Sequence, residues 1–272
     1  MNLKIYYLSS EIEPFSKSYS LSTFSKEFSS IVNSEKKYDI RLIQPKYSYI
    51  SDRRFILREV IRLKDLKMNI GKIDDTINLR SGFIPGTKVQ VYFMEHEKYF
   101  DVSELIYKSK NGRLYKNNCE KFTFFTYAAL DTLKKLFWIP DILIYNDWQF
   151  ALCPTLVNEL FEETLSKTKK VFFIHSIKQL HDFDKEIYAK FGMQNNNKKI
   201  STLADCIEKS DITFFMNDAN DEISNFIKKN KDIKKVLKKS KHQIIDYNLD
   251  MEVSDRIEIY NNLLLELNKI AK

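Results

Sequence analysis

The chain has 272 residues, of which 43% are hydrophobic and 14% aromatic, so it can bury a sizeable core as one large domain or two small ones and is not intrinsically disordered. The cysteines at 119, 153 and 206 are far apart, which argues against both a disulfide framework and a zinc site. Met1 leads almost directly into a strand and no run of about 18 apolar residues follows, so we expect a cytoplasmic protein with no signal peptide and no membrane contact.

The net charge of +7 is concentrated in one stretch. Residues 228–241, KKNKDIKKVLKKSK, hold eight lysines and one aspartate, and the other 36 basic residues are balanced by 36 acidic ones. The stretch contains no arginine and no aromatic residue, which argues against nucleic acid as a partner because base reading and stacking use those side chains. We interpret it as a solvated helix or tail; the alternative is a site that binds a polyanion by counterion release.

Strand-like and helix-like patterns alternate along the chain. Strands are expected at residues 4–8, 39–45, 88–94, 141–145, 170–174 and 211–216. Helices are expected at residues 21–32, 118–137 and 253–270. Residues 57–95 alternate as hairpin strands do, with turns near Gly71 and at Pro85-Gly86. This order predicts an α/β fold built on one Rossmann-like, doubly wound, mostly parallel sheet, with an additional β-hairpin region and a carboxyl-terminal helix.

The loop after the first strand is the first place to look for an anionic ligand. It contains Ser9, Ser10, Glu11, Pro14 and Lys17, and a helix follows it. Ligands of open parallel sheets bind at the carboxyl ends of the strands, where the next helix directs its free amide groups outward.

Two segments of the chain carry a family resemblance. Residues 9–21, SSEIEPFSKSYSL, resemble the S-S-E-x-x-P-F-x-K-x-G-G-L opening of bacterial glycogen synthases and plant starch synthases. Residues 138–152, WIPDILIYNDWQFAL, are similar to the family segment W-x-P-D-I-I-H-x-H-D-W-Q-x-A-L. The resemblance covers about residues 3–226 and is to the amino-terminal half of these retaining glycosyltransferases of family 5, which have the GT-B fold. It implies transfer of glucose from ADP-glucose to an α-1,4-glucan without a metal or an organic cofactor.

The resemblance also predicts how the chain is divided. Residues 1–227 are expected to form the synthase-like Rossmann domain, residues 228–252 a lysine-rich linker, and residues 253–272 a closing amphipathic helix packed on the same domain. The complete enzymes bind most of the nucleotide sugar with a second Rossmann-like domain. The 45 residues after position 227 have no room for it, so we expect a domain that lacks this donor-binding half.

The resemblance assigns candidate binding residues to the loops after the strands. Lys17 is similar to the lysine that faces the diphosphate, with a solvated loop lysine as the alternative. Tyr19 and Ser20 stand where the family has two glycines, which let the backbone approach the diphosphate and the sugar. Tyr99 and Trp148 could stack on sugar rings, and the alternative for both is packing in the core.

Four further candidates have polar side chains. Asn146 stands where the family has the histidine that contacts the transferred sugar, and an amide carries no proton at neutral pH. Asn117 stands where the family has an acidic residue, and its alternative role is a helix cap with Glu120 in a capping box. His175 matches the histidine at the end of a family strand, or is a core histidine. Asp147 is expected to tie its loop to backbone amides.

These residues favour a degenerate relative of the family, inactive alone, that binds an α-glucan or assists a full-length synthase. One alternative is an active half that binds ADP-glucose together with a separately encoded donor-domain partner. The other is an interaction protein that holds a polyanion through residues 228–241.

Overall fold

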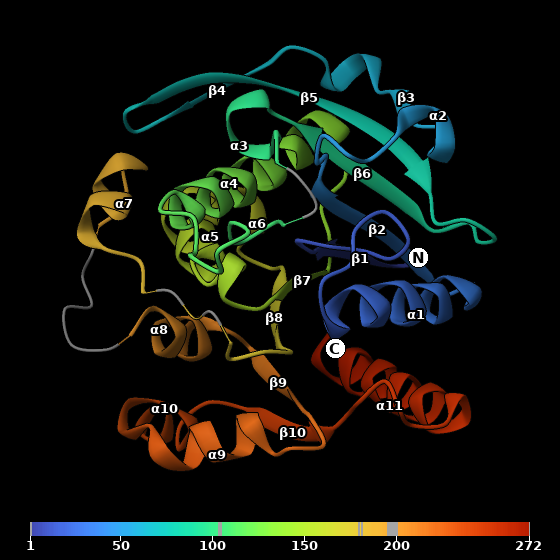
Figure 1. Ribbon diagram of the computed structural model, residues 1–272, viewed down its shortest axis with the longest axis vertical. Helices are drawn as coiled ribbons and strands as arrows, with labels where there is room; N and C mark the ends of the chain where they lie inside the picture. The colour runs from blue at the N-terminus through green and yellow to red at the C-terminus, as the bar shows by residue number, and fades with distance from the viewer. Residues whose placement is uncertain (1, 103–104, 179, 181, 195–200, 272) are drawn as a thin grey trace.

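The strands form one mixed sheet with helices on both faces (Figure 1), in a computed structural model that describes residues 2–102, 105–178, 180, 182–194 and 201–271. The order across the sheet is β10-β9-β8-β7-β1-β2-β6-β5-β3, and β4 pairs with β5. The parallel strands are β1 (Leu3–Leu8), β2 (Tyr38–Pro45), β6 (Gln90–Glu95), β7 (Ile142–Asn146), β8 (Lys169–Ile174), β9 (Ile212–Asn217) and β10 (His242–Asp246). The antiparallel strands are β3 (Arg58–Glu59), β4 (Leu66–Ile70) and β5 (Ile73–Phe83). The predicted fold class is therefore confirmed.

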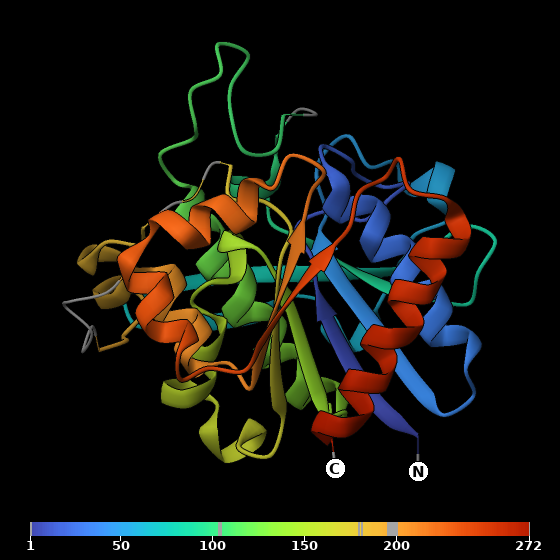
Figure 2. The same ribbon diagram turned by 90° about the horizontal axis from the view of Figure 1, so that it is seen from below.

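The helices cover the sheet in two layers (Figure 2). One layer holds α1 (Ser20–Ser34) and α11 (Val253–Ala271), and the other holds α4 (Asn118–Leu136), α5 (Cys153–Leu160), α8 (Thr202–Lys209), α9 (Glu222–Lys229) and α10 (Lys231–Leu237). The shorter helices are α2 (Asp52–Phe55), α3 (Glu97–Phe100), α6 (Glu162–Leu165) and α7 (Lys185–Lys190), with 3₁₀ turns η1 (Ile61–Leu63) and η2 (Trp148–Phe150). Central strands such as β7 and β9 are buried on both faces, which explains their largely apolar sequences.

Residues 228–252 form regular structure rather than the expected linker. They contain α10 and β10, and β10 pairs in parallel with β9. Ile233, Val236 and Leu237 are buried at helical spacing. This apolar stripe holds α10 against the rest of the domain, while the lysines of the helix are exposed. Because lysine dominates the composition of this segment, the stripe was not recognised in the sequence.

The carboxyl-terminal helix α11 lies against α1 (Figure 1). The guanidinium group of Arg256 donates to both carboxylate oxygens of Glu27, at 3.0 and 3.1 Å, and the Tyr260 hydroxyl donates to Glu27 at 2.7 Å. The Tyr260 ring also meets the Phe24 ring edge-on, with centroids 5.4 Å apart. These contacts connect the last helix to the first one across most of the chain length.

The capping box predicted for α4 is wrong. Asn117 occupies the N-cap position, but its side chain makes no capping hydrogen bond. Glu120 instead forms an ion pair with Lys190 at 2.6 Å and accepts a hydrogen bond from Tyr99. A carboxylate held by those partners is not available to the backbone at the start of its own helix.

The turn between β4 and β5 requires glycine at position 71. Gly71 has a φ of +53°, and a Cβ at this position would lie 2.6 Å from the Gly192 nitrogen. We expect Gly71→Ala to destabilise the fold by about 2–4 kcal/mol, because it combines backbone strain with a clash against neighbouring backbone. Gly86→Ala is the matched control, since Gly86 also has a positive φ (+77°) but no atom within 4 Å of the added Cβ. Equal losses for the two variants in urea unfolding would contradict the assignment of a close contact.

Candidate functional site

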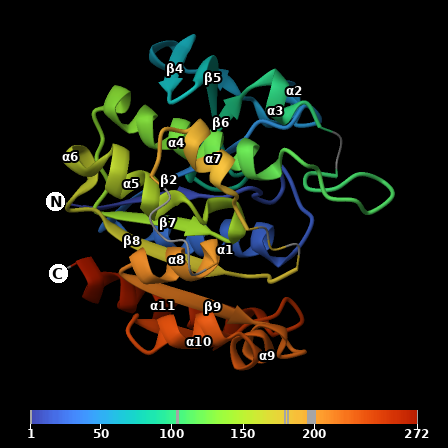
Figure 3. The same cartoon turned by 90° about the vertical axis from the view of Figure 1, so that its left-hand side faces the viewer.

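A cleft of about 570 Å³ lies at the carboxyl ends of β1, β7 and β8. Figure 3 shows the segment beyond these ends, where a long green excursion from about residue 105 to residue 116 projects from the body of the protein. The base of that excursion contributes one wall of the cleft. The residues that line it are Lys17, Ser18, Tyr19, Leu105, Ile106, Tyr107, Lys108, Trp148, Gln149, Ser176 and Lys178.

The loop after β1 is held by the buried carboxylate of Glu11. Glu11 accepts hydrogen bonds from the Ser18 amide, from the Ser18 hydroxyl at 2.7 Å and from the Tyr107 hydroxyl at 2.8 Å. Burial raises the pKa of Glu11, and the three donors act against that shift. This carboxylate therefore joins the start of α1 to the wall formed by Tyr107.

Tyr19 crosses from the first loop to the loop after β7. It occupies the N-cap position of α1, and its hydroxyl donates to Asp147 Oδ2 at 2.5 Å. Its ring also meets the Tyr107 ring edge-on, with centroids 6.3 Å apart. A side chain therefore fills the position at which a glycine would leave open space.

Asp147 connects three segments from the centre of the site. Its Oδ1 accepts from the His175 amide at 2.5 Å and from the Ser176 amide at 3.2 Å, while Oδ2 receives the Tyr19 hydroxyl. Its backbone has φ 61° and ψ −177°, a conformation that favours glycine and is costly for aspartate. Burial raises the pKa of Asp147 to about 7. The bonds to His175 and Ser176 give Asp147 the amide-bonding role expected for it.

Asn146 and His175 lie side by side beneath the cleft. His175 Nε2 is 3.2 Å from Asn146 Oδ1, and Asn146 Nδ2 donates to the Leu8 carbonyl at 2.7 Å. Asn146 Oδ1 also accepts from the Tyr7 hydroxyl at 3.2 Å. Because the amide nitrogen is committed to Leu8, Oδ1 is the acceptor and His175 Nε2 carries the proton. Burial lowers the pKa of His175 to about 3, so the imidazole is neutral at physiological pH.

The remaining predicted residues separate into two groups. Lys17 is at the rim of the cleft and pairs with Glu13 at 3.2 Å, and Ser20 begins α1 beside Tyr19. Trp148 borders the cleft but is 3% exposed, with its ring against Phe122 at 5.6 Å between centroids.

Tyr99 and Asn117 lie outside the cleft. Tyr99 is buried and stacks on His96 with ring centroids 4.7 Å apart, as its core-packing alternative predicted. Asn117 is exposed at the start of α4. Neither residue contributes to the lining described above.

The sequence analysis missed three parts of the site. Glu11 is charged and directly follows an apolar strand and two serines, a signal that could have marked it as a buried carboxylate. Tyr107 and Gln149 had no local signal, because their roles depend on contacts with distant segments. Gln149 Oε1 is buried without a hydrogen-bond partner in the described part of the chain, and Gln149 lines the cleft.

Within the described residues, no group of three or more histidine, cysteine, aspartate or glutamate side chains is arranged to hold a metal ion. No helix in that same part of the chain is both long and apolar enough to cross a lipid bilayer.

The sheet order and the cleft at the carboxyl ends of its strands define a Rossmann-like domain with a cleft where ligands of such sheets usually bind. Residues 4–229 match the family described as the starch synthase catalytic domain, and the chain belongs to that family. The family predicted from the two motifs is therefore confirmed.

Individual relatives match only part of their own length. Glycogen synthase from Chlorobium phaeobacteroides is 31% identical over 220 residues, which are 78% of this chain and 45% of the relative. Glycogen synthase from Pelodictyon phaeoclathratiforme is 35% identical over 178 residues, which are 65% of this chain and 36% of the relative. The chain thus spans less than half the length of these curated relatives.

One solved structure shows the same fold. It is the catalytic domain of starch synthase IV from Arabidopsis thaliana bound to ADP and acarbose, with a TM-score of 0.72 and 18% sequence identity. The match covers 92% of this chain and 52% of that one.

Proposed function

We propose that this domain binds an α-glucan in the cleft and does not transfer glucose by itself. The observation that carries the proposal is the bridge from Tyr19 to Asp147, 2.5 Å between their oxygens. The family motif has glycine where this chain has Tyr19, and glycine would leave backbone amides accessible to a diphosphate. With a phenol ring at that position, the diphosphate has less room, whereas the rest of the cleft remains open.

Three lysines line the cleft, and two of them are already paired, Lys17 with Glu13 and Lys178 with Glu222 at 3.0 Å. Much of the remaining lining suits a neutral, hydroxyl-rich ligand. Tyr19 presents part of an aromatic ring, and Ser18 and Ser176 offer hydroxyl groups. Gln149 Oε1 is a buried acceptor without a partner in the described chain, and a sugar hydroxyl could satisfy it. The starch synthase IV domain with the same fold was solved with acarbose and ADP bound, which supports a saccharide as the class of ligand.

The groups near the reaction centre are poorly suited to transfer. Asn146 has no titratable proton and is completely buried with both ends of its amide engaged. His175 is neutral and covered, so it offers little charge to a leaving group. Lys17 retains an exposed side chain but is paired with Glu13. These features support a binding role or an accessory role beside a full-length synthase.

A second candidate function is transfer in combination with a separate donor-binding domain. It is supported by Lys17, whose side chain is 55% exposed at the rim and could exchange its bond to Glu13 for a diphosphate. This candidate requires incorporation of glucose from ADP-glucose into a glucan once the partner domain is added. Failure under every pairing would exclude it and leave the glucan-binding proposal standing.

Calorimetric titration with maltooligosaccharide and, separately, with ADP-glucose tests the primary proposal. We expect binding of the maltooligosaccharide and much weaker binding of ADP-glucose. Gln149→Leu should weaken maltooligosaccharide binding by about threefold to tenfold, the loss expected for one hydrogen bond to a neutral group. Gln90→Leu is the matched control, because Gln90 is a half-buried glutamine on β6 and does not line the cleft. No maltooligosaccharide binding, or equal effects of the two variants, would overturn the proposal.

A further inference from the structure

The lysines of residues 228–241 form an exposed cationic surface on α9, α10 and the turn that follows them. All of these lysines are exposed, and none makes an ion pair with any described residue. The lysines of this surface are Lys228, Lys229, Lys231, Lys234, Lys235, Lys238, Lys239 and Lys241. We call this set the lysine surface.

The lysine surface is held in place by the fold. Ile233 and Val236 are buried below α10, and the Asn230 side chain caps the helix by accepting from the Asp232 and Ile233 amides at 3.1 and 3.0 Å. The charges therefore project from ordered helices, so little ordering entropy would be lost when they meet a ligand. The other charges of the chain balance, which makes this surface the source of its net positive charge.

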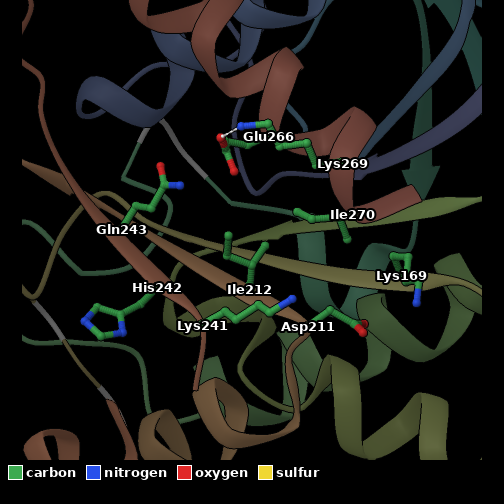
Figure 4. A pocket seen from close by; sticks show the side chains of 9 residues that line it. All are labelled: Lys169, Asp211, Ile212, Lys241, His242, Gln243, Glu266, Lys269 and Ile270. Atoms are coloured by element: carbon green, nitrogen blue, oxygen red, sulfur yellow. Dashed lines mark hydrogen bonds and ion pairs between the residues drawn. The ribbon is translucent and has the colours of Figure 1, made fainter. Parts of the chain in front are cut away.

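The last lysine of the surface also lines a pocket of about 460 Å³ (Figure 4). The pocket lies between the carboxyl-terminal half of α11 and the amino ends of β8, β9 and β10, at the edge of the sheet opposite to the cleft. Lys169, Lys241 and Lys269 contribute ammonium groups to it, and His242 lies next to Lys241.

Two carboxylates line the same pocket, and both already have partners. Asp211 Oδ2 accepts from the Lys170 amide at 2.7 Å, and Glu266 pairs with Lys269 at 2.7 Å. Lys169 and Lys241 make no ion pair with a described residue. The pocket can therefore offer two ammonium groups to an anion without first breaking an ion pair.

We propose that the lysine surface and this pocket together bind a linear chain of phosphate groups, recognised by the high charge density of the repeated phosphates. Lysine binds phosphate as a point charge and suits repeated groups of high charge density. Residues 228–241 have no exposed large apolar side chain that would insert into lipid, so a membrane is not the ligand that this surface fits. They also have no arginine or aromatic side chain for reading or stacking bases.

The surface fits inorganic polyphosphate, and the sugar-phosphate backbone of a nucleic acid is the competing source that the experiment must exclude. Fluorescence anisotropy with end-labelled polyphosphate and with oligothymidylate of equal phosphate number distinguishes them, measured over a series of salt concentrations. We expect binding that weakens steeply with salt, because counterions are released. Polyphosphate should bind more tightly than oligothymidylate, and the reverse order would overturn the proposal. Poly-L-glutamate of equal charge should bind more weakly than polyphosphate.

The test variant is Lys234→Gln, Lys235→Gln, Lys238→Gln and Lys239→Gln in one chain. It should weaken binding by about tenfold or more at low salt and reduce the logarithmic salt slope by about 3, at about 0.7 for each lysine. The matched control replaces four exposed lysines elsewhere that make no ion pair with described residues, namely Lys36, Lys67, Lys88 and Lys135. Both variants lose the same net charge.

A separate pair, Lys169→Gln with Lys241→Gln, tests the pocket, and it should reduce the slope by about 1.4. Equal losses for the test and control quadruple variants, no binding by the wild-type chain, or equal binding of poly-L-glutamate would overturn the proposal. Because α-glucan binding is measured with a neutral ligand at the opposite edge of the sheet, failure of either proposal leaves the other unaffected.

Discussion

Asp147→Asn is expected to make the stability of this protein depend strongly on pH between about 4 and 6.5. In the wild-type chain two buried groups oppose each other in this range. Asp147 holds a proton up to a pKa of about 7 in the folded state, so the folded chain loses stability as pH rises from the unfolded aspartate pKa toward 7. His175 stays neutral down to a pKa of about 3, so the folded chain loses stability as pH falls from about 6.5 toward 3.

Removing one of the two titrating groups leaves the pH dependence caused by the other uncompensated. In Asp147→Asn the amide keeps the shape of the side chain but does not titrate. Only the loss of stability on acidification caused by His175 then remains. The free energy of unfolding should then fall by about 1.4 kcal/mol more than wild type for each pH unit of acidification in this range. Urea unfolding at a series of pH values measures the slope.

The opposite slope should appear in His175→Gln, where an amide can still donate to Asn146. Stability relative to wild type should then fall as pH rises from about 4 to 7, because only the Asp147 effect remains. Parallel pH profiles for wild type and both variants would show that these two side chains do not titrate as their burial implies.

Tyr19→Gly is expected to open the cleft to a nucleotide diphosphate. The substitution removes the ring that fills the position of a family glycine and frees space beside the first amides of α1. We expect ADP to bind about tenfold or more tightly than it binds wild type, at a cost of about 2 kcal/mol in stability because Asp147 loses a hydrogen-bond donor. Calorimetry and urea unfolding measure the two quantities.

Tyr19→Phe distinguishes the effect of the ring's volume on ADP binding from the effect of its hydrogen bond to Asp147 on stability. The phenylalanine ring keeps the bulk but cannot donate to Asp147, whose raised pKa of about 7 keeps it protonated at lower pH. Stability should therefore fall by about 0.5–1.5 kcal/mol, the range for a neutral hydrogen bond, while ADP affinity stays at the wild-type level. An equal gain in ADP affinity for both variants would show that the ring does not close the cleft.

The fold was largely predictable because its central strands are buried on both sides. Mostly apolar runs such as 141–145 and 211–216 lie within one residue of β7 and β9. The segment from 228 to 252 was not predictable in the same way. Its buried side chains are a minority among lysines, and β10 has alternating exposure because it lies at the edge of the sheet.

The candidate site was predictable where motif positions lie in adjacent loops. Lys17, Tyr19 and Trp148 line one cleft, and Asn146, Asp147 and His175 lie together beneath it. Tyr99 was misplaced because a residue near a strand end can turn toward the core as easily as toward the cleft, and here His96 and Glu120 hold it there. No local pattern distinguishes these outcomes.

The amino-acid order alone was enough to establish the family, the α/β class and the identity of the side chains that replace the family's glycines and histidine. Those properties follow from apolar periodicity and from residue types at set spacings, which are local. Folding in three dimensions settled the protonation and the partners of the site. Asp147 has a raised pKa, His175 a lowered one, and Tyr19 closes onto Asp147, because burial and hydrogen bonding join segments 128 residues apart.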